Sequence, residues 1–209
     1  MIHPKTKLQH INEVVGYGVF ATERIPKGTI VYIKDSLEHI IVPEVYHQHD
    51  AEMKAVIDKY SYIDEHGNRI VSWDFAKYVN HCCNCNTMST GYGFEIAIRD
   101  VEAGEEITDE YGIFNIDQEM ELICSEPTCR KKIALDDFER YYEKWDDKIV
   151  TAIFDLWNVD QPLINLLDEK TQKEIEMLRN DPASYKSVYA LKYHPQPQLH
   201  LNGQQKTIA

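Results

Sequence analysis

Hydrophobic and polar residues alternate in short runs over the first half of the chain. The run 94–99 reads Phe-Glu-Ile-Ala-Ile-Arg, and this period of two predicts a strand. Isoleucine, valine and tyrosine dominate residues 29–33, and turn residues separate this run from the strand-forming residues 14–21. Residues 60–64 and 69–73 flank a glycine-containing turn, a pattern typical of a β-hairpin. The pattern therefore predicts several short strands.

A different period appears after about residue 130. Between residues 138 and 156, large hydrophobic residues recur at steps of three and four, which predicts an amphipathic helix with Asp136 or Asp137 as its N-cap. Shorter helices are expected around 163–167 and 169–179, and residues 44–60 also have helical character. The second half of the chain is therefore expected to be mainly helical.

Composition and charge narrow the class of protein. The 209 residues are 43% hydrophobic and 11% aromatic, enough for a packed core. No run approaches ~18 apolar residues, and the start lacks the hydrophobic region of a signal peptide, so we expect a soluble, intracellular protein without membrane contact, cytoplasmic or, in a eukaryote, nuclear. The net charge is −13 and no basic patch is present, which argues against direct nucleic-acid binding. The acidic surplus favours a basic partner, although it can also serve solubility alone.

The five cysteines form two tight clusters. They lie at positions 82, 83, 85, 124 and 129. An odd number in two clusters is a poor disulfide framework, so these spacings indicate either a metal site or free thiols.

Three separated segments carry the candidate chemistry. The first begins Gly16-Tyr17-Gly18, and a Pro-Lys-Gly turn follows too soon for the helix that a dinucleotide fingerprint requires. The second, residues 80–86, reads Asn-His-Cys-Cys-Asn-Cys-Asn, and the third, residues 104–112, reads Gly-Glu-Glu-Ile-Thr-Asp-Glu-Tyr-Gly. Each alone is also explained by an ordinary turn, so the information lies in their order and spacing.

In that order, the three segments resemble the motifs of SET-domain protein lysine methyltransferases, over roughly residues 10–130. The resemblance implies an α+β fold, the SET-domain β-clip, in which small β-sheets surround a pseudoknot and a helical extension follows. The expected division is a SET domain at 1–115, a post-SET-like cysteine element at 116–133 and a helical C-terminal extension at 134–209. In the family, the second and third segments are threaded past each other at the cofactor.

The resemblance also implies roles for individual residues. Tyr111 matches the active-site tyrosine, and Phe114 is expected to cover the adenine of S-adenosylmethionine. The residues expected to contact this cofactor are Gly16, Tyr17, Gly18, Asn80, His81, Tyr111 and Phe114.

A methyltransferase of this kind needs a channel for the lysine side chain. A lysine ammonium, with an ordinary pKa of ~10.4, must lose a proton before it attacks, and a narrow aromatic channel lowers that pKa by desolvation. The expected channel residues are Tyr62, Trp73, Tyr78, Tyr92 and Asp109. Each aromatic residue is equally explained as ordinary core, and Asp109 stands where the family often has an aromatic residue.

The cysteines resemble a shortened form of the family's post-SET zinc element. Cys83, Cys124 and Cys129 would be three ligands of one structural zinc ion, with Cys85 or Cys82 as the fourth. Reduced thiols without metal are the alternative.

The expected function is therefore methylation of lysine side chains in a basic protein or peptide, a histone or another protein, with S-adenosylmethionine as methyl donor. The alternative is a catalytically silent module of the same fold that binds a peptide, or a zinc-stapled interaction module. Affinity for S-adenosylmethionine and turnover distinguish these possibilities.

Overall fold

The computed structural model describes residues 1–124 and 126–195, and within them the strands form four small sheets. The first sheet has the order β1 (Thr6–Asn12), β2 (Gly16–Ala21), β10 (Glu106–Asp109) and β7 (Asn80–His81). The second has the order β3 (Ile30–Ile33), β9 (Phe94–Ala97) and β8 (Thr87–Ser89). The third has the order β4 (His39–Ile41), β6 (Arg69–Val71) and β5 (Ser61–Ile63). The fourth pairs β11 (Met120–Glu121) with β12 (Lys132–Ile133).

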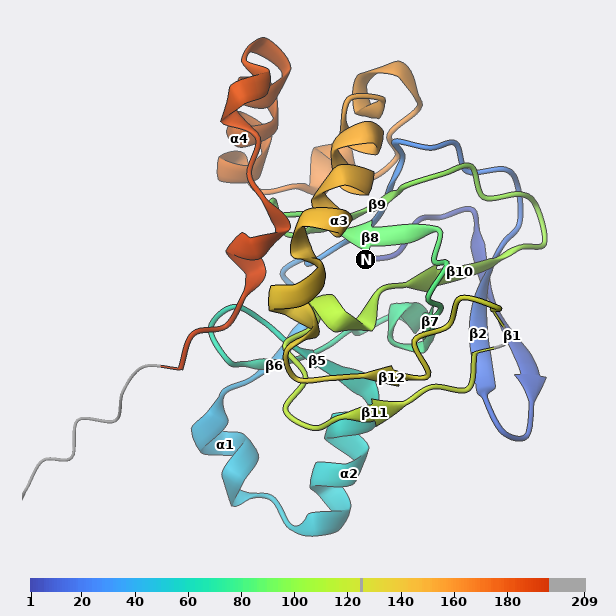
Figure 1. Cartoon of the computed structure of the whole chain (residues 1–209), viewed down its shortest axis with the longest axis vertical. Coiled ribbons are helices and arrows are strands. Elements are labelled where there is room, and N and C mark those ends of the chain that lie inside the picture. The colour runs from blue at the N-terminus through green and yellow to red at the C-terminus, as the bar shows by residue number, and fades with distance from the viewer. Residues whose placement is uncertain (125, 196–209) are drawn as a thin grey trace, which may run out of the picture.

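The described part of the chain contains four α-helices. The described helices are α1 (Pro43–Gln48), α2 (Ala51–Tyr60), α3 (Asp137–Ile153) and α4 (Glu169–Asn180). Figure 1 shows α1 and α2 at the end opposite α4. The helical region expected at 44–60 is two helices, because the Asp50 side chain accepts a hydrogen bond from the Met53 N–H and starts a new helix.

Strand β10 lies at the centre of the arrangement. It pairs antiparallel with β2 and parallel with β7, where Thr108 faces Asn80 and Asp109 faces His81. The buried Asn86 side chain joins the segment 80–86 to β10. Its amide donates to the Glu106 carbonyl at 2.7 Å and accepts from the Thr108 N–H at 2.9 Å. The expected α+β arrangement of small sheets is confirmed, and β10 carries the third sequence motif into its centre.

The C-terminal helices share their core with the sheets. Ile30, Phe94 and Ile96 from the second sheet pack in one buried cluster with Ile153 of α3 and Leu178 of α4. Helix α3 forms because its apolar residues fall on one stripe that this core buries.

A second contact fixes the segment that follows β10. A Cβ atom on Gly112 would lie 2.9 Å from the Trp145 ring, so only glycine lets α3 approach this closely. The helix therefore positions the Tyr111–Gly112 segment.

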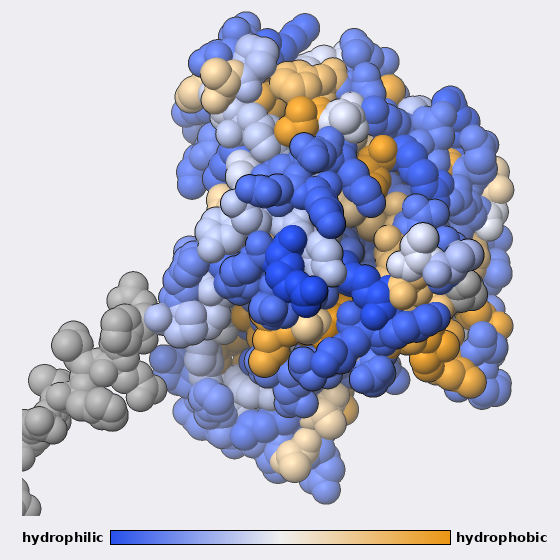
Figure 2. Space-filling model, viewed as in Figure 1, coloured by the Kyte–Doolittle hydropathy of each residue, from blue (hydrophilic) through white to orange (hydrophobic). Residues whose placement is uncertain are grey.

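The outer surface is mainly polar. Figure 2 shows hydrophilic residues over most of the viewed face, interrupted by small hydrophobic patches. Among the described residues, no helix combines the length and the apolar character needed to cross a membrane.

Candidate active site

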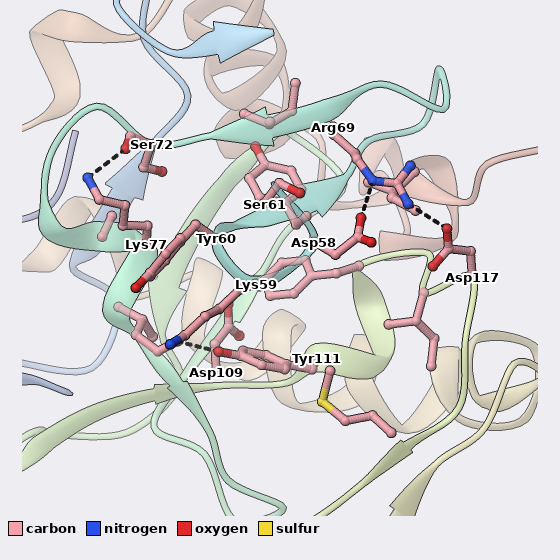
Figure 3. Close-up of a pocket in the computed structure, with 18 of the residues that line it drawn as sticks. Asp58, Lys59, Tyr60, Ser61, Arg69, Ser72, Lys77, Asp109, Tyr111 and Asp117 are labelled. Atoms are coloured by element: carbon pink, nitrogen blue, oxygen red, sulfur yellow. Dashed lines mark hydrogen bonds and ion pairs between the residues drawn. The ribbon is translucent and has the colours of Figure 1, made fainter. Parts of the chain in front are cut away.

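A cavity of about 460 Å³ opens beside the end of β10. Its walls come from the β5–β6 hairpin, the segment 76–79, β9 and the segment 114–120 (Figure 3). Lys59 and Lys77 lie on one side of the cavity, and Arg69 lies on another, held by Asp58 and Asp117 at 2.8 and 2.6 Å. The cavity thus has charged groups of both signs at its rim.

Tyr111 lies in this cavity directly after β10. Its hydroxyl donates a hydrogen bond to the Val79 carbonyl at 2.6 Å, and its backbone N–H donates to His81 Nδ1 at 3.2 Å. Burial raises the pKa of Tyr111, and the nearby charges of Asp109 and Glu95 raise it further to a smaller extent. The phenol therefore stays protonated at neutral pH. Because its only proton is used on Val79, the oxygen presents lone pairs to the cavity.

Phe114 completes an aromatic wall. Its ring centroid lies 5.6 Å from that of Tyr111 and 5.2 Å from that of Tyr62, and all three residues line the cavity. Tyr111 and Phe114 are thus brought together, as a cofactor and channel surface would require.

The other residues expected at the cofactor lie outside the cavity lining, on β2 and β7, which flank β10 in the first sheet. Asn80 Nδ2 donates to the Tyr17 carbonyl at 3.0 Å and to Glu106 Oε1 at 2.8 Å. A Cβ atom on Gly18 would lie 2.5 Å from Glu106 Oε1, and Gly16 has a φ of +82°, which favours glycine. The backbone conformation therefore favours glycine at position 16, whereas a side chain at position 18 would have to displace the ends of the Glu106 and Ile11 side chains.

Two of the five expected channel residues line the cavity. Tyr62 forms part of its aromatic wall, and Asp109 lies at the end of β10 with its side chain 1% exposed or less. Tyr78 lies nearby but outside the cavity lining, with its ring edge-on to those of Tyr17 and Tyr60 at 5.8 and 5.6 Å.

The structure does not bring Trp73 or Tyr92 to the cavity. Trp73 is 46% exposed, and its indole N–H donates to Asp35 at 3.1 Å. Tyr92 is buried, and its hydroxyl accepts a hydrogen bond from the Lys186 N–H at 2.9 Å. Both have structural partners of their own.

Three cysteines lie together next to this site. One ligand atom from each of Cys83, Cys124 and Cys129 lies within 4.8 Å of the others, and Cys83 Sγ is 3.6 Å from Cys129 Sγ. Two thiolates on a tetrahedral zinc ion, with Zn–S distances of about 2.3 Å, would be separated by about 3.7 Å. The cluster could therefore hold a metal ion.

The remaining cysteines differ from each other. Cys85 is 1% exposed and packs with Met88 and Ile113 in a hydrophobic cluster, so the structure does not bring it to the group of three. Burial raises the pKa of Cys82, which also interacts with the Cys124 thiol. In Cys124 itself, hydrogen bonds from the Cys83 and Glu126 backbones outweigh burial and lower the pKa.

His81 links the cysteine cluster to the cavity. Its Nδ1 lies 3.0 Å from the Asp109 carbonyl oxygen and 3.2 Å from the Tyr111 backbone nitrogen, and its Nε2 lies 3.4 Å from Cys83 Sγ. Burial lowers the pKa of His81, so the ring is neutral at neutral pH. The histidine thus sets the position of Tyr111 relative to the cysteines.

Glu95 is a cavity residue that the sequence pattern did not single out. The alternation in 94–99 places it on the polar face of β9, a face that normally meets water. In the structure this face meets the cavity, beside Asp109 and Tyr111. The signal that could have indicated Glu95 is its charge, because it lies within a predicted strand in the first half of the chain.

Comparison with known proteins gives a family match over part of the chain. Residues 16–112 match the family model of the SET domain. It is similar to a variant-silencing SET domain-containing protein of Plasmodium falciparum (isolate 3D7), with 30% identity over 135 residues, 56% of this chain and 5% of that protein. The chain therefore spans only about one twentieth of the length of that relative (5%).

Among solved structures, the chain is similar to the methyltransferase domain of human histone-lysine N-methyltransferase SETMAR. The TM-score is 0.43 and the sequence identity 14%, over 64% of this chain and 58% of that one.

Proposed function

We propose that this protein is an S-adenosylmethionine-dependent protein-lysine N-methyltransferase. The observation that carries the proposal is the position of Tyr111, which lines one cavity with Tyr62 and Phe114 and whose hydroxyl, having donated its proton to Val79, has only lone pairs to offer a ligand. A neutral lysine amine that donates an N–H to these lone pairs would hold its own lone pair in a fixed direction. Positioning of this kind supplies much of the rate of a direct displacement.

Two contacts support a methyl-donor site at these residues. The Asn80 amide donates to the Tyr17 carbonyl at 3.0 Å, and the Tyr111 N–H donates to the neighbouring His81 ring at 3.2 Å. We propose that Gly16, Tyr17, Gly18, Asn80, His81, Tyr111 and Phe114 hold S-adenosylmethionine, whose sulfonium supplies the methyl group. The acceptor we propose is a lysine of a basic protein, which the net charge of −13 would attract.

The test is incubation of the full chain with labelled S-adenosylmethionine and a panel of histones and cell extract. We expect label in acceptor proteins at lysine, located by mass spectrometry. Calorimetry on the same preparation measures donor affinity. Donor binding without transfer to any acceptor contradicts the enzyme and supports the silent peptide-binding module, and absence of donor binding contradicts both.

We also propose that Cys83, Cys124 and Cys129 bind one structural zinc ion, and that residues 116–133 act as a short post-SET-like element around it. Two contacts support this: the Arg130 N–H donates to Cys83 Sγ at 3.4 Å, and the Lys131 N–H donates to Cys129 Sγ at 3.2 Å, as N–H groups do around metal thiolates. Metal analysis should give about one zinc ion per chain, lost in C124S/C129S together with resistance to proteolysis in this segment. Fully active, metal-free protein contradicts the zinc site.

A further inference from the structure

Asp109 has a buried oxygen atom without a donor when both it and Glu95 are ionised. Asp109 is 1% exposed, and its Oδ1 accepts a hydrogen bond from the Glu110 N–H at 2.7 Å. Its Oδ2 then has no hydrogen-bond partner among residues 1–124 and 126–195, whereas a proton on either carboxyl group lets Asp109 and Glu95 form a hydrogen bond. The carboxylate oxygens of Glu38 and Asp137 that also lack partners do not line the cavity, whereas Asp109 does (Figure 3). A buried acceptor without a donor, in a residue that lines a cavity, points to a donor that enters that cavity.

A second carboxyl group lines the same cavity. Glu95 lies on β9 opposite Ser89 of β8 and Tyr32 of β3, so its place is fixed by the sheet. Burial raises the pKa of Glu95 to about 7. Burial and then the charge of Glu95 raise the pKa of Asp109 well above its usual range. Two neighbouring buried carboxyl groups cannot both ionise easily, so the pair keeps one proton and one negative charge near neutral pH.

No resident cation neutralises this charge. Within the described ranges, no salt bridge reaches either Glu95 or Asp109, and Lys59 and Lys77 of the rim are paired with neither. The amino group of Met1 already pairs with Asp35 and Glu38. The titratable groups that interact with the pair or lie beside it are Tyr32, Tyr62, Tyr111, Cys85, Glu38, Glu110 and the amino group of Met1.

We propose that Glu95 and Asp109 form a paired carboxyl site that binds the ammonium group of the incoming lysine and accepts its proton. The inference rests on the proposed methyltransferase function and names the groups that select and activate its substrate. Tyr111 cannot accept this proton, because its phenol is neutral and its oxygen is far less basic than a carboxylate.

One N–H bond of the lysine ammonium breaks, its proton forms an O–H bond with the carboxylate, and its electrons remain on nitrogen as a lone pair. That lone pair forms the N–C bond to the methyl group, while the electrons of the C–S bond pass to sulfur and give a neutral thioether. The methylated ammonium leaves as the cation, and the carboxyl group returns its proton to water. A carboxylate whose pKa lies near the working pH is a better base than an ordinary one.

Binding can be tested without a methyl donor or an acceptor protein. The full chain, labelled with ¹³C at the Asp and Glu carboxyl groups, is titrated by NMR with n-butylammonium, which has the end of a lysine side chain, and with neutral 1-pentanol. We expect n-butylammonium to shift the Glu95 and Asp109 carboxyl signals, and 1-pentanol to leave them in place. In D109N and in E95Q, n-butylammonium should bind about tenfold more weakly, as for loss of a charged hydrogen bond.

The control is E13Q, which removes an exposed carboxylate that does not line the cavity. It should bind n-butylammonium like the wild type. Carboxyl signals that ignore n-butylammonium overturn the inference, as does equal weakening in E13Q and D109N. Because D109N could disturb β10, E95Q supplies the same information from a different strand.

The proton transfer is tested separately by the pH dependence of kcat, measured on an acceptor protein that the labelled-donor assay identifies. Removal of the Glu95 charge lowers the pKa of Asp109, so E95Q should move the midpoint of the profile to lower pH, whereas a structural role would lower kcat at every pH alike. An unmoved midpoint contradicts proton acceptance. A wild-type chain that binds the amine and transfers no methyl group contradicts only the proposed function. A chain that transfers methyl groups while its carboxyl pair ignores the amine contradicts only this inference.

Discussion

Two neighbouring carboxylates at the end of β10 lie in opposite environments. Glu110 is 2% exposed and receives both N–H groups of the Arg130 fork at 2.7 and 2.9 Å, together with the Gly112 N–H at 2.9 Å. Asp109 is as deeply buried, but its region contains a cavity and a second carboxyl group in place of an arginine. A buried charge with its partner in the chain holds the fold together, and one without a partner keeps a place for a ligand.

The largest effect on stability is expected from removing the cation that pairs with Glu110. Arg130→Met keeps much of the side-chain volume but leaves Glu110 buried without a cation, so the free energy of unfolding should fall by about 3–5 kcal/mol. Urea denaturation measures this change. The double variant with E110Q should recover most of the loss. A loss below about 1 kcal/mol, as for an exposed ion pair, contradicts this role for Arg130.

On the cavity side, Tyr111→Phe is expected to act on the rate. Loss of a hydroxyl that aligns the amine should lower kcat by about a hundredfold, or ~3 kcal/mol, with little change in donor affinity. If the hydroxyl only satisfies Val79, the variant loses about 1 kcal/mol of stability and little activity. Melting temperature and single-turnover transfer on one preparation distinguish the two outcomes.

Asn80→Ala should weaken S-adenosylmethionine binding by about 1–3 kcal/mol, because its amide holds the Tyr17 carbonyl and Glu106 where β7 passes β2. Calorimetry on the folded variant measures the affinity. Asn84→Ala, at an exposed position of the same segment, is the control and should bind like the wild type. Equal affinities of the Asn80 variant and this control remove Asn80 from the donor site.

Much of the fold follows from local pattern. The hairpin of β5 and β6 was predicted because its turn contains Gly67, which has a φ of +80°. Helix α3 was predicted because one stripe of its surface is apolar. Strand β1 was missed, since its residues are mostly exposed and show no alternation, and it exists through its pairing with β2.

The site could be predicted only where residue order carried the information. The three motifs selected Tyr111 and Phe114, which do share the cavity. Aromatic type alone could not show which way Trp73 or Tyr92 points, since an aromatic side chain suits a core as well as a channel. Glu95 was missed because alternation gives the face of a strand but not what that face meets.

The last prediction concerns the carboxyl pair and stability. In the folded chain Glu95 keeps its proton up to a pH of about 7, and Asp109 also titrates well above its usual range. The unfolded chain releases both protons near the ordinary values of ~4.3 and ~3.9. Between these limits the folded state binds more protons, so the free energy of unfolding must fall as pH rises.

From pH 5 to pH 8, the wild type should therefore lose about 1–2 kcal/mol relative to E95Q, after allowance for water in the cavity. Urea denaturation at several pH values measures the difference. Glu13→Gln, at an exposed carboxylate, should follow the wild type. If E95Q and the wild type instead lose stability in parallel, Glu95 ionises with an ordinary pKa. Asp109 then has no raised-pKa carboxyl group beside it, and the proposed difference from the environment of Glu110 is contradicted. A stability gap that opens only above pH 5 would show that this side of β10 maintains a charge the fold does not neutralise, whereas Glu110 already has its cation in Arg130.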